Sequence, residues 1–231
     1  MPLRARIPLL PSRLIRLRLT LGGAPVDLWF SDGSELAVIW SIFITGEYSA
    51  LDVPPARTII DLGANIGVTA LWFRSLNPYA RIVSVEPDPF TFEKLCLNLA
   101  RDPLVKCVNA AITPESGPVG FASAGESWES RVDSASQAST HQVCGITLDE
   151  LVASEAIDAI DILKVDIEGM EYSVLPQARS LANAGQVIGE LHPDLADHDV
   201  AGFVDELATR SGLTRVPGLP SHLFLLRRES A

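Results

Sequence analysis

From residue 58 onward, short β-branched apolar runs alternate along the chain with longer segments whose apolar residues recur at helical spacing. This pattern predicts strands at 58–62, 81–86 and 105–110, and helices near 68–77 and 90–101. Because strands and helices alternate and the strands are continuously apolar, we expect parallel strands covered by helices on both faces. The first half of this region therefore predicts half of a doubly wound α/β sheet.

The same alternation resumes after residue 147. It predicts helices at 148–153, about 170–184 and about 200–211, and strands at 161–166 and 186–191. The last segments, "TRVPG" and "SHLFLLRR", predict a closing pair of strands. The stretch 111–147 interrupts the pattern as an excursion, and its Ser- and Ala-rich part, 123–140, is expected to be mobile on the surface.

Residues 1–57 follow a different pattern and predict a small N-terminal cap on the main domain, 58–231. Two strand candidates, "RLIRLRLTL" and "PVDLWF", flank the turn "LGGAP", and the apolar segment "ELAVIWSIFITGEY" is compatible with a helix. Five arginines lie within the first eighteen residues, where we expect a solvated basic segment.

Composition narrows the classes of partner. The chain has 231 residues, 47% of them hydrophobic, and a formal net charge of −11, which disfavours a general binder of nucleic acid backbones. No stretch approaches the roughly 20 apolar residues of a membrane span. The three cysteines show neither paired nor metal-type spacing, so a reducing, cytoplasmic location is expected.

The first predicted strand runs into a glycine turn within "TIIDLGANIGVTALWF", residues 58–73. The turn reads Gly63, Ala64, Asn65, Ile66, Gly67. A dinucleotide fingerprint requires a further glycine in the middle of this turn, and that glycine is missing. Asp61 ends the strand, where its carboxylate would repel a pyrophosphate but attract an ammonium or sulfonium group. S-adenosylmethionine carries both cations, so the turn favours this methyl donor over NAD.

Glu86 ends the second predicted strand. A carboxylate at this place can accept hydrogen bonds from the two ribose hydroxyls of a nucleoside, but NAD sites also use an acid here, so Glu86 does not discriminate between the two cofactors. The alternative is that Asp61 and Glu86 are helix-capping or solvent-facing carboxylates.

Five motifs occur in a fixed order along the chain: "IIDLGANIG", "VSVEPDP", "TLDEL", "ILKVDIEGMEYSVL" and "VIGELH". In this order they resemble the FkbM-type family of S-adenosylmethionine-dependent methyltransferases, closely over about 46–192 and loosely at the two ends. The resemblance implies a seven-stranded class I methyltransferase sheet of the Rossmann-like type. Its implied strand order is 3-2-1-4-5-7-6 with the last-threaded strand antiparallel, and the family's usual chemistry is O-methylation.

The resemblance also implies which residues contact the methyl donor. Glu86 would hold the ribose, and Asn109, at the end of the third strand, would lie near the adenine. The methionine end would be lined by Asp61, Gly63, Ala64, Asn65 and Gly67.

The fourth predicted strand ends in "KVDIEGMEY". Lys164, Asp166 and Glu168 would point the same way if the strand continued through residue 168. We expect Asp166 to contact the donor's amino group or the acceptor hydroxyl, whereas Lys164 is either catalytic or the partner of Asp166 or Glu168 in an ion pair. Glu171 fits an acid in the first turn of the next helix.

The fifth predicted strand places Glu190 and His192 on one side, next to the end of the fourth strand. His192 is the best-placed general base for a hydroxyl, although a lone histidine before proline is often a structural hydrogen-bonding residue. Asp166, Glu190 and His192 could instead hold Mg²⁺, as the corresponding strand ends do in catechol-type O-methyltransferases. We favour the metal-free mechanism because an imidazole suits this hard cation poorly.

Together these observations predict an S-adenosylmethionine-dependent O-methyltransferase that acts on a hydroxyl of a small or medium natural product or sugar. The alternatives are a cofactor-binding protein without catalysis and, less favoured, an NAD-type oxidoreductase. The sequence predicts a small-molecule acceptor and indicates no oligomeric state.

Overall fold

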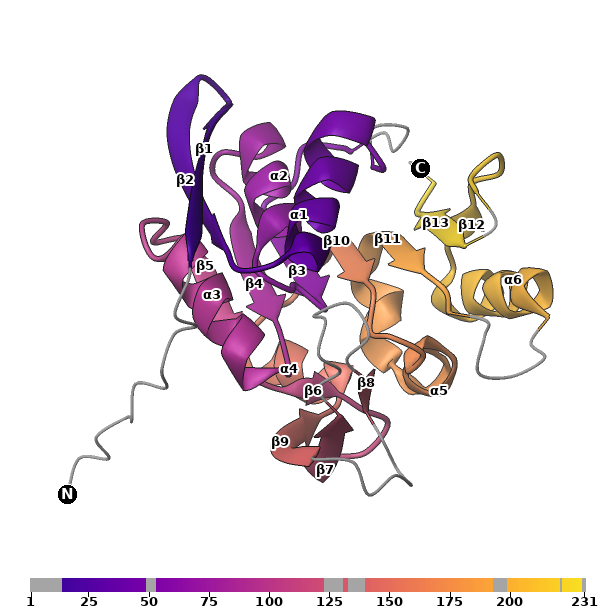
Figure 1. Ribbon diagram of the computed structural model, residues 1–231. Helices are drawn as coiled ribbons and strands as arrows, with labels where there is room; N and C mark the ends of the chain where they lie inside the picture. Colours follow the sequence, from indigo (N-terminus) through magenta and orange to yellow (C-terminus); the bar gives the residue numbers. More distant parts are fainter. Residues whose placement is uncertain are drawn as a thin grey trace.

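A seven-stranded mixed sheet forms the centre of the molecule (Figure 1). The computed structural model describes residues 14–48, 53–122, 131–132, 140–192, 199–220 and 222–229. The strands, in spatial order, are β12 (Thr214–Arg215), β13 (Leu223–Arg227), β11 (Ala184–Glu190), β10 (Ile160–Val165), β3 (Thr58–Leu62), β4 (Arg81–Val85) and β5 (Val105–Val108).

Five neighbouring strands of this sheet, from β11 to β5, run parallel, whereas β13 is antiparallel to both β11 and β12. Counted in chain order from β3, the arrangement is 3-2-1-4-5-7-6 with an antiparallel last strand. The predicted doubly wound α/β topology is therefore confirmed.

Helices cover both faces of the sheet because each buried strand alternates its side chains between them. Ile60 and Leu62 of β3 belong to one hydrophobic cluster, whereas Ile59 belongs to the cluster on the opposite face. The helices are α2 (Val68–Leu76), α3 (Pro89–Leu99), α4 (Leu148–Ser154), α5 (Glu171–Val174) and α6 (Val200–Ser211). Residues of α2 and α3 pack in the cluster that contains Ile59, and residues of α4 and α6 pack in the other.

The helix predicted from about 170 to 184 is wrong in its extent. The α-helix α5 ends at Val174 and is followed by two 3₁₀ helices, η2 (Leu175–Gln177) and η3 (Arg179–Asn183). Pro176 lacks the N–H that a continuing α-helix would use, and its ring clashes with the preceding turn, so the helix stops there.

The excursion between 111 and 147 contains a second sheet that the sequence pattern did not predict. Its strands, in the spatial order β6-β9-β7-β8, are Ala111–Ile112, Thr140–Ile146, Gly117–Ala122 and Arg131–Val132. Phe121, Val143 and Ala111 form a small buried cluster beneath it. The remainder of the Ser- and Ala-rich stretch, residues 123–130 and 133–139, lies outside the described residues.

The N-terminal cap packs on the same face of the sheet as α2 (Figure 1). A hairpin of β1 (Ile15–Leu21) and β2 (Ala24–Phe30) precedes the helix α1 (Gly33–Trp40) and the π-helix η1 (Ser41–Thr45), as predicted. Asn98 of α3 accepts the Trp29 N–H at 2.7 Å and donates to its carbonyl at 3.0 Å, which ties the hairpin to the domain. The boundary at residue 57 stays a prediction.

The basic N-terminal residues lie partly within β1. Arg18 forms an ion pair with Asp27 at 2.8 Å, and Arg16 lies 4.0 Å from the same carboxylate. Arg4, Arg6 and Arg13 lie outside the described residues.

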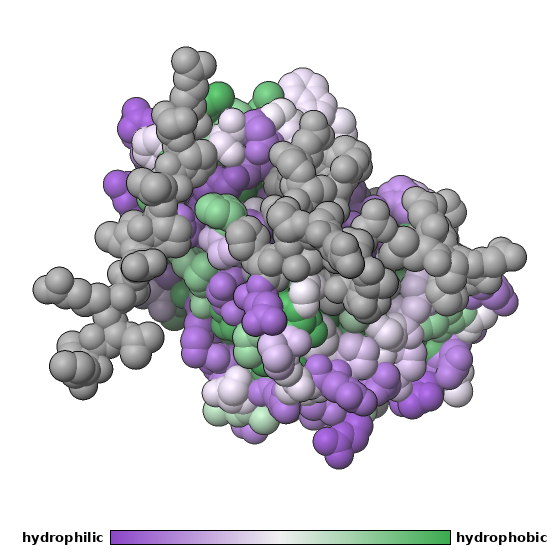
Figure 2. Space-filling model, turned by 60° about the horizontal axis from the view of Figure 1, so that its bottom comes forward, coloured by the Kyte–Doolittle hydropathy of each residue, from purple (hydrophilic) through white to green (hydrophobic). Residues whose placement is uncertain are grey.

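Within the described part of the chain, no helix is long and apolar enough to cross a lipid bilayer. Figure 2 brings the lower side of Figure 1 forward, and the described residues on that face are mostly hydrophilic with small hydrophobic patches between them.

Candidate active site

Four parallel strands bring their carboxyl ends to one edge of the sheet, where ligands of doubly wound folds bind. In space the strands follow the order β4, β3, β10, β11, and Lys164 of β10 is in register with Asp61 of β3. Glu86 follows β4, Asp166 follows β10, and Glu190 ends β11. The predicted site residues of these strands therefore share one edge.

The turn after β3 has the tight backbone that its glycines predict. Gly63, Asn65 and Gly67 all have positive φ angles, and the N–H groups of Gly63 and Ala64 donate to the Val85 carbonyl. A Cβ atom at Gly63 would lie 1.7 Å from the Asp166 carbonyl oxygen. Glycine is therefore required where the ends of β3 and β10 approach each other.

Asp61 and Lys164 form a buried charged pair beneath this turn. The Lys164 Nζ lies 3.4 Å from Asp61 Oδ1 and 3.2 Å from Asp166 Oδ2, and it donates to the carbonyls of Leu62 and Gly63. Asp61 is fully buried, and its carboxylate accepts no hydrogen bond among the described residues. Burial raises the pKa of Asp61 against the opposing effect of the Lys164 charge. One ammonium group thus faces two carboxylates.

Glu86 is buried and already holds backbone groups. Its Oε2 accepts the Asn65 N–H and its Oε1 accepts the Asp88 N–H, both at 2.9 Å. Burial raises the pKa of Glu86 to about 8. Asn109 is exposed, and its side-chain amide donates to the carbonyls of Glu86 and Pro87, so it is linked to the end of β4.

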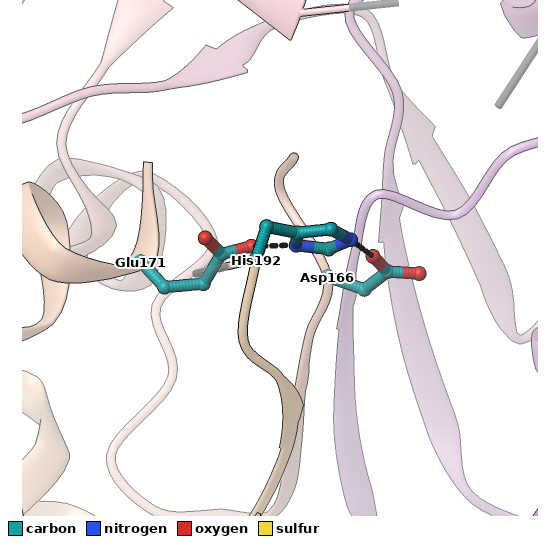
Figure 3. A group of neighbouring side chains, drawn as sticks. All are labelled: Asp166, Glu171 and His192. Carbon is teal, nitrogen blue, oxygen red and sulfur yellow. Dashed lines mark hydrogen bonds and ion pairs between the residues drawn. The ribbon is translucent and has the colours of Figure 1, made fainter. Parts of the chain in front are cut away.

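His192 lies between carboxylates at the end of β11 (Figure 3). Its Nδ1 is 3.1 Å from Glu171 Oε1, and its Nε2 is 3.5 Å from Glu168 Oε2 and 3.8 Å from Asp166 Oδ1. Burial lowers the pKa of His192, but the hydrogen bond to Glu171 and the three carboxylate charges outweigh it and raise the pKa to about 9. In the absence of a ligand the imidazole is therefore positively charged at neutral pH.

The strand does not continue through residue 168, because β10 ends at Val165, so the condition for Lys164, Asp166 and Glu168 to share a direction is not met. The backbone turns there, Glu168 has a φ of 54°, and its carboxylate faces His192 instead of Lys164. The pKa values of Glu168 and Glu190 are both raised to about 7, and burial is the main cause in each case.

The carboxylates that meet His192 differ in part from those that the sequence suggested. Asp166, Glu171 and His192 each offer one possible metal-ligand atom, and these atoms lie within 4.8 Å of one another. The third member of this group is therefore Glu171, whereas the sequence suggested Glu190. The sequence pattern alone indicates only a first-turn helix acid at Glu171. The useful signal was the turn "DIEGME", whose N–H groups need an acceptor where the turn is partly buried.

Tyr48 of the cap is an aromatic residue that the sequence allows either to cover a ligand or to pack the cap on the domain. Its side chain is buried, its ring centroid lies 5.6 Å from that of Trp72, and the charges of Lys164, Asp166 and Glu190 affect its pKa, which burial raises. The cap therefore reaches the edge of the sheet where the site residues meet.

Comparison with known families gives a match to the model of the Methyltransferase FkbM domain over residues 61–209. The hexuronic acid methyltransferase AglP of Haloferax volcanii is 29% identical over 68% of this chain and 64% of its own length. The AMB antimetabolite synthetase AmbE of Pseudomonas aeruginosa is 26% identical over 74% of this chain and 10% of its own length. The chain thus spans just under two thirds of one relative and a tenth of the other.

Solved structures with a similar fold include the fibrillarin pre-rRNA processing protein of Methanococcus jannaschii. Its TM-score is 0.54 at 10% identity, covering 94% of this chain and 84% of that one. The fibrillarin/Nop5p complex gives a TM-score of 0.51 at 12% identity, covering 87% of this chain and 85% of that one. At these identities the likeness is one of fold, and it confirms the predicted Rossmann-like class.

Proposed function

Because this chain belongs to the FkbM methyltransferase family, we propose that it is an S-adenosylmethionine-dependent O-methyltransferase acting on a hydroxyl of a small or medium natural product or sugar. The observation that carries the choice of donor is the buried Asp61 carboxylate, which accepts no hydrogen bond among the described residues. Lys164 lies 3.4 Å from this carboxylate and shares its charge with Asp166, so the site still favours a cationic ligand.

The charges below the glycine turn support a cationic donor. Lys164 contributes one positive charge to two carboxylates, those of Asp61 and Asp166. His192 lies 3.8 Å from Asp166 but is shared with Glu168 and Glu171, so the acids of this site outnumber its cations. The ammonium and sulfonium groups of S-adenosylmethionine can supply the missing positive charge, whereas the pyrophosphate of NAD would be repelled. Lys164 then acts as a positioning residue, because it contacts the donor only through the two acids that it holds.

The residues of the other strand ends fit the rest of the donor. We propose that Asp61, Gly63, Ala64, Asn65 and Gly67 line its methionine end. Each Glu86 oxygen has one backbone N–H partner and retains a lone pair for a ribose hydroxyl. Asn109 lies beside Glu86 on the side where the adenine would follow.

Above pH 8, where Glu86 is mostly ionised, we expect Glu86→Ala to weaken the binding of S-adenosylhomocysteine by about 2–4 kcal/mol, because two charge-assisted hydrogen bonds to the ribose are lost. Isothermal titration calorimetry measures the change, and circular dichroism confirms that the variant is folded. Glu115→Ala removes an exposed carboxylate from the same chain and should leave the affinity unchanged. A folded Glu86→Ala protein with wild-type affinity would show that Glu86 does not bind the ribose.

On the acceptor side, His192 is the proposed general base. In methyl transfer the acceptor oxygen attacks the donor methyl in line, the new C–O bond forms as the C–S bond breaks, and the electron pair of that bond remains on sulfur. The hydroxyl proton must leave during or after this step. His192 is the proposed acceptor of this proton, because its Nε2 lies 3.8 Å from Oδ1 of Asp166 at the end of the adjacent strand. Asp166 would orient the donor amino group or the acceptor hydroxyl.

The name of AglP supports a sugar-type acceptor, and the net charge of −11 supports a small molecule over a nucleic acid. A cytoplasmic location stays a prediction based on cysteine usage.

A cofactor-binding protein without catalysis is the alternative within the same fold. Incubation with labelled S-adenosylmethionine and a panel of sugar and natural-product alcohols separates the two, because only the enzyme adds a methyl group to an acceptor.

A further inference from the structure

Glu171 is a carboxylate held by the backbone beside the candidate site. It is fully buried at the start of α5, its Oε1 accepts the Ile167 N–H, and its Oε2 accepts the Gly169 N–H, both at 2.9 Å. Backbone donors of this kind stabilise the ionised form of a carboxylate and fix its plane. Glu171 therefore presents a fixed negative acceptor to whatever approaches Oε1.

The group that approaches is the imidazole of His192, whose Nδ1 lies 3.1 Å from Oε1 (Figure 3). An ionised carboxylate can only accept, so Nδ1 carries the proton of this hydrogen bond. Nε2 is then the nitrogen that gains and loses a proton. It points away from Glu171, toward Glu168 at 3.5 Å and Asp166 at 3.8 Å.

We propose that Glu171 is a positioning residue that fixes the tautomer and orientation of His192, so that Nε2 receives the proton of the acceptor hydroxyl. This inference rests on the proposed methyl transfer. As the C–O bond forms and the C–S electron pair stays on sulfur, the proton passes from the hydroxyl to Nε2. The resulting imidazolium lies between Glu171 on one side and Asp166 and Glu168 on the other, which stabilises its charge.

Nuclear magnetic resonance of ¹⁵N-labelled imidazole rings tests the proposal without an acceptor. In the wild-type protein saturated with S-adenosylhomocysteine, we expect neutral His192 to carry its proton on Nδ1, with the resonance assigned by its loss in His192→Ala. Glu171→Gln keeps the shape but removes the charge, and we expect it to lower the pKa of His192 by about one unit or more.

The charged groups that face His192 include Glu171 of α5, Asp166 and Glu168 of the preceding turn, and Glu190 of β11. Glu190→Gln is the matched control, since it removes a nearby charge without removing the Nδ1 hydrogen bond. It should shift the pKa of His192 less and leave the tautomer unchanged. Once an acceptor is known, Glu171→Gln should lower the limiting kcat at high pH and move the pH dependence toward lower pH, while the KM for S-adenosylmethionine stays the same.

Three results would overturn the proposal. The first is a neutral wild-type His192 with its proton on Nε2, which can be seen even if Glu171→Gln fails to fold. The second is an unchanged His192 pKa in folded Glu171→Gln. The third is stoichiometric binding of Mn²⁺ that broadens the His192 resonance and is lost in Asp166→Asn, because Nε2 would then be a metal ligand. Failure to bind S-adenosylhomocysteine would instead contradict the proposed function, and the tautomer can then be measured in the protein alone.

Discussion

Replacing His192 with alanine is expected to lower methyl-transfer turnover by about 10²–10⁴-fold, which is the usual contribution of a positioned general base. An alcohol is a weak acid, so its oxygen becomes a good nucleophile only if its proton has an acceptor near the reacting centre. The affinity for S-adenosylhomocysteine should be nearly unchanged, because His192 is not among the proposed donor contacts. Turnover is measured as methyl gain on an acceptor.

The same assignment predicts a pH dependence. The pKa of His192 is raised to about 9, and a base must be unprotonated, so turnover should rise about tenfold per pH unit below pH 9 and level off above it. His222→Ala, which changes an exposed histidine, should leave the profile unchanged. Wild-type turnover should also survive EDTA. A loss of less than threefold in His192→Ala would contradict the base assignment, and activity abolished by EDTA and restored by Mg²⁺ would establish the metal alternative.

The second large effect is expected for stability. Lys164→Met should lower the free energy of unfolding by about 3–5 kcal/mol, because it leaves the buried Asp61 carboxylate without its cationic partner. Lys164 is 2% exposed, so solvent cannot replace its charge. Urea denaturation measures the change. Lys106→Met removes an ammonium that is 57% exposed from its pair with Glu155, and it should cost less than about 1 kcal/mol.

A double substitution separates charge from packing at this position. If the unpaired buried charge causes the loss, Asp61→Asn should restore much of the stability of Lys164→Met, since the amide carries no charge. The two changes would add without compensation if Lys164 contributed through packing alone. A Lys164→Met protein within about 1 kcal/mol of the wild type would contradict the paired arrangement.

The main sheet could be predicted because its signals are local. The apolar runs at β3 and β4 are bounded by glycine, proline and charged residues, and each ends at the carboxylate that the sequence places at the site edge. The strand order of the main sheet could be predicted from the alternation of strands and helices together with the family motifs. Asp61, Glu86 and Asp166 could be placed at one edge for the same reason, because the carboxyl ends of parallel strands coincide.

Other features depend on contacts that no local pattern contains. Glycine and proline interrupt β7, polar residues occur in β9, and the two strands pair across the 17 intervening residues, 123–139, so both resemble loops in the sequence. The contact between Glu171 and His192 joins two segments separated by 21 residues. It arises because β10 stops at Val165 and the chain turns, which a prediction that extended the strand could not show.

Whether the site binds a methyl donor or a dinucleotide can be tested by a calorimetric comparison of two ligands with the same wild-type protein. S-adenosylhomocysteine and NAD share an adenosine, but only the former presents an ammonium group to Asp61, and only the latter brings a pyrophosphate to a turn that lacks the middle glycine. We expect S-adenosylhomocysteine to bind at one site per chain and NAD to bind more weakly or to give no heat. Tighter binding of NAD would contradict a methyl-donor site.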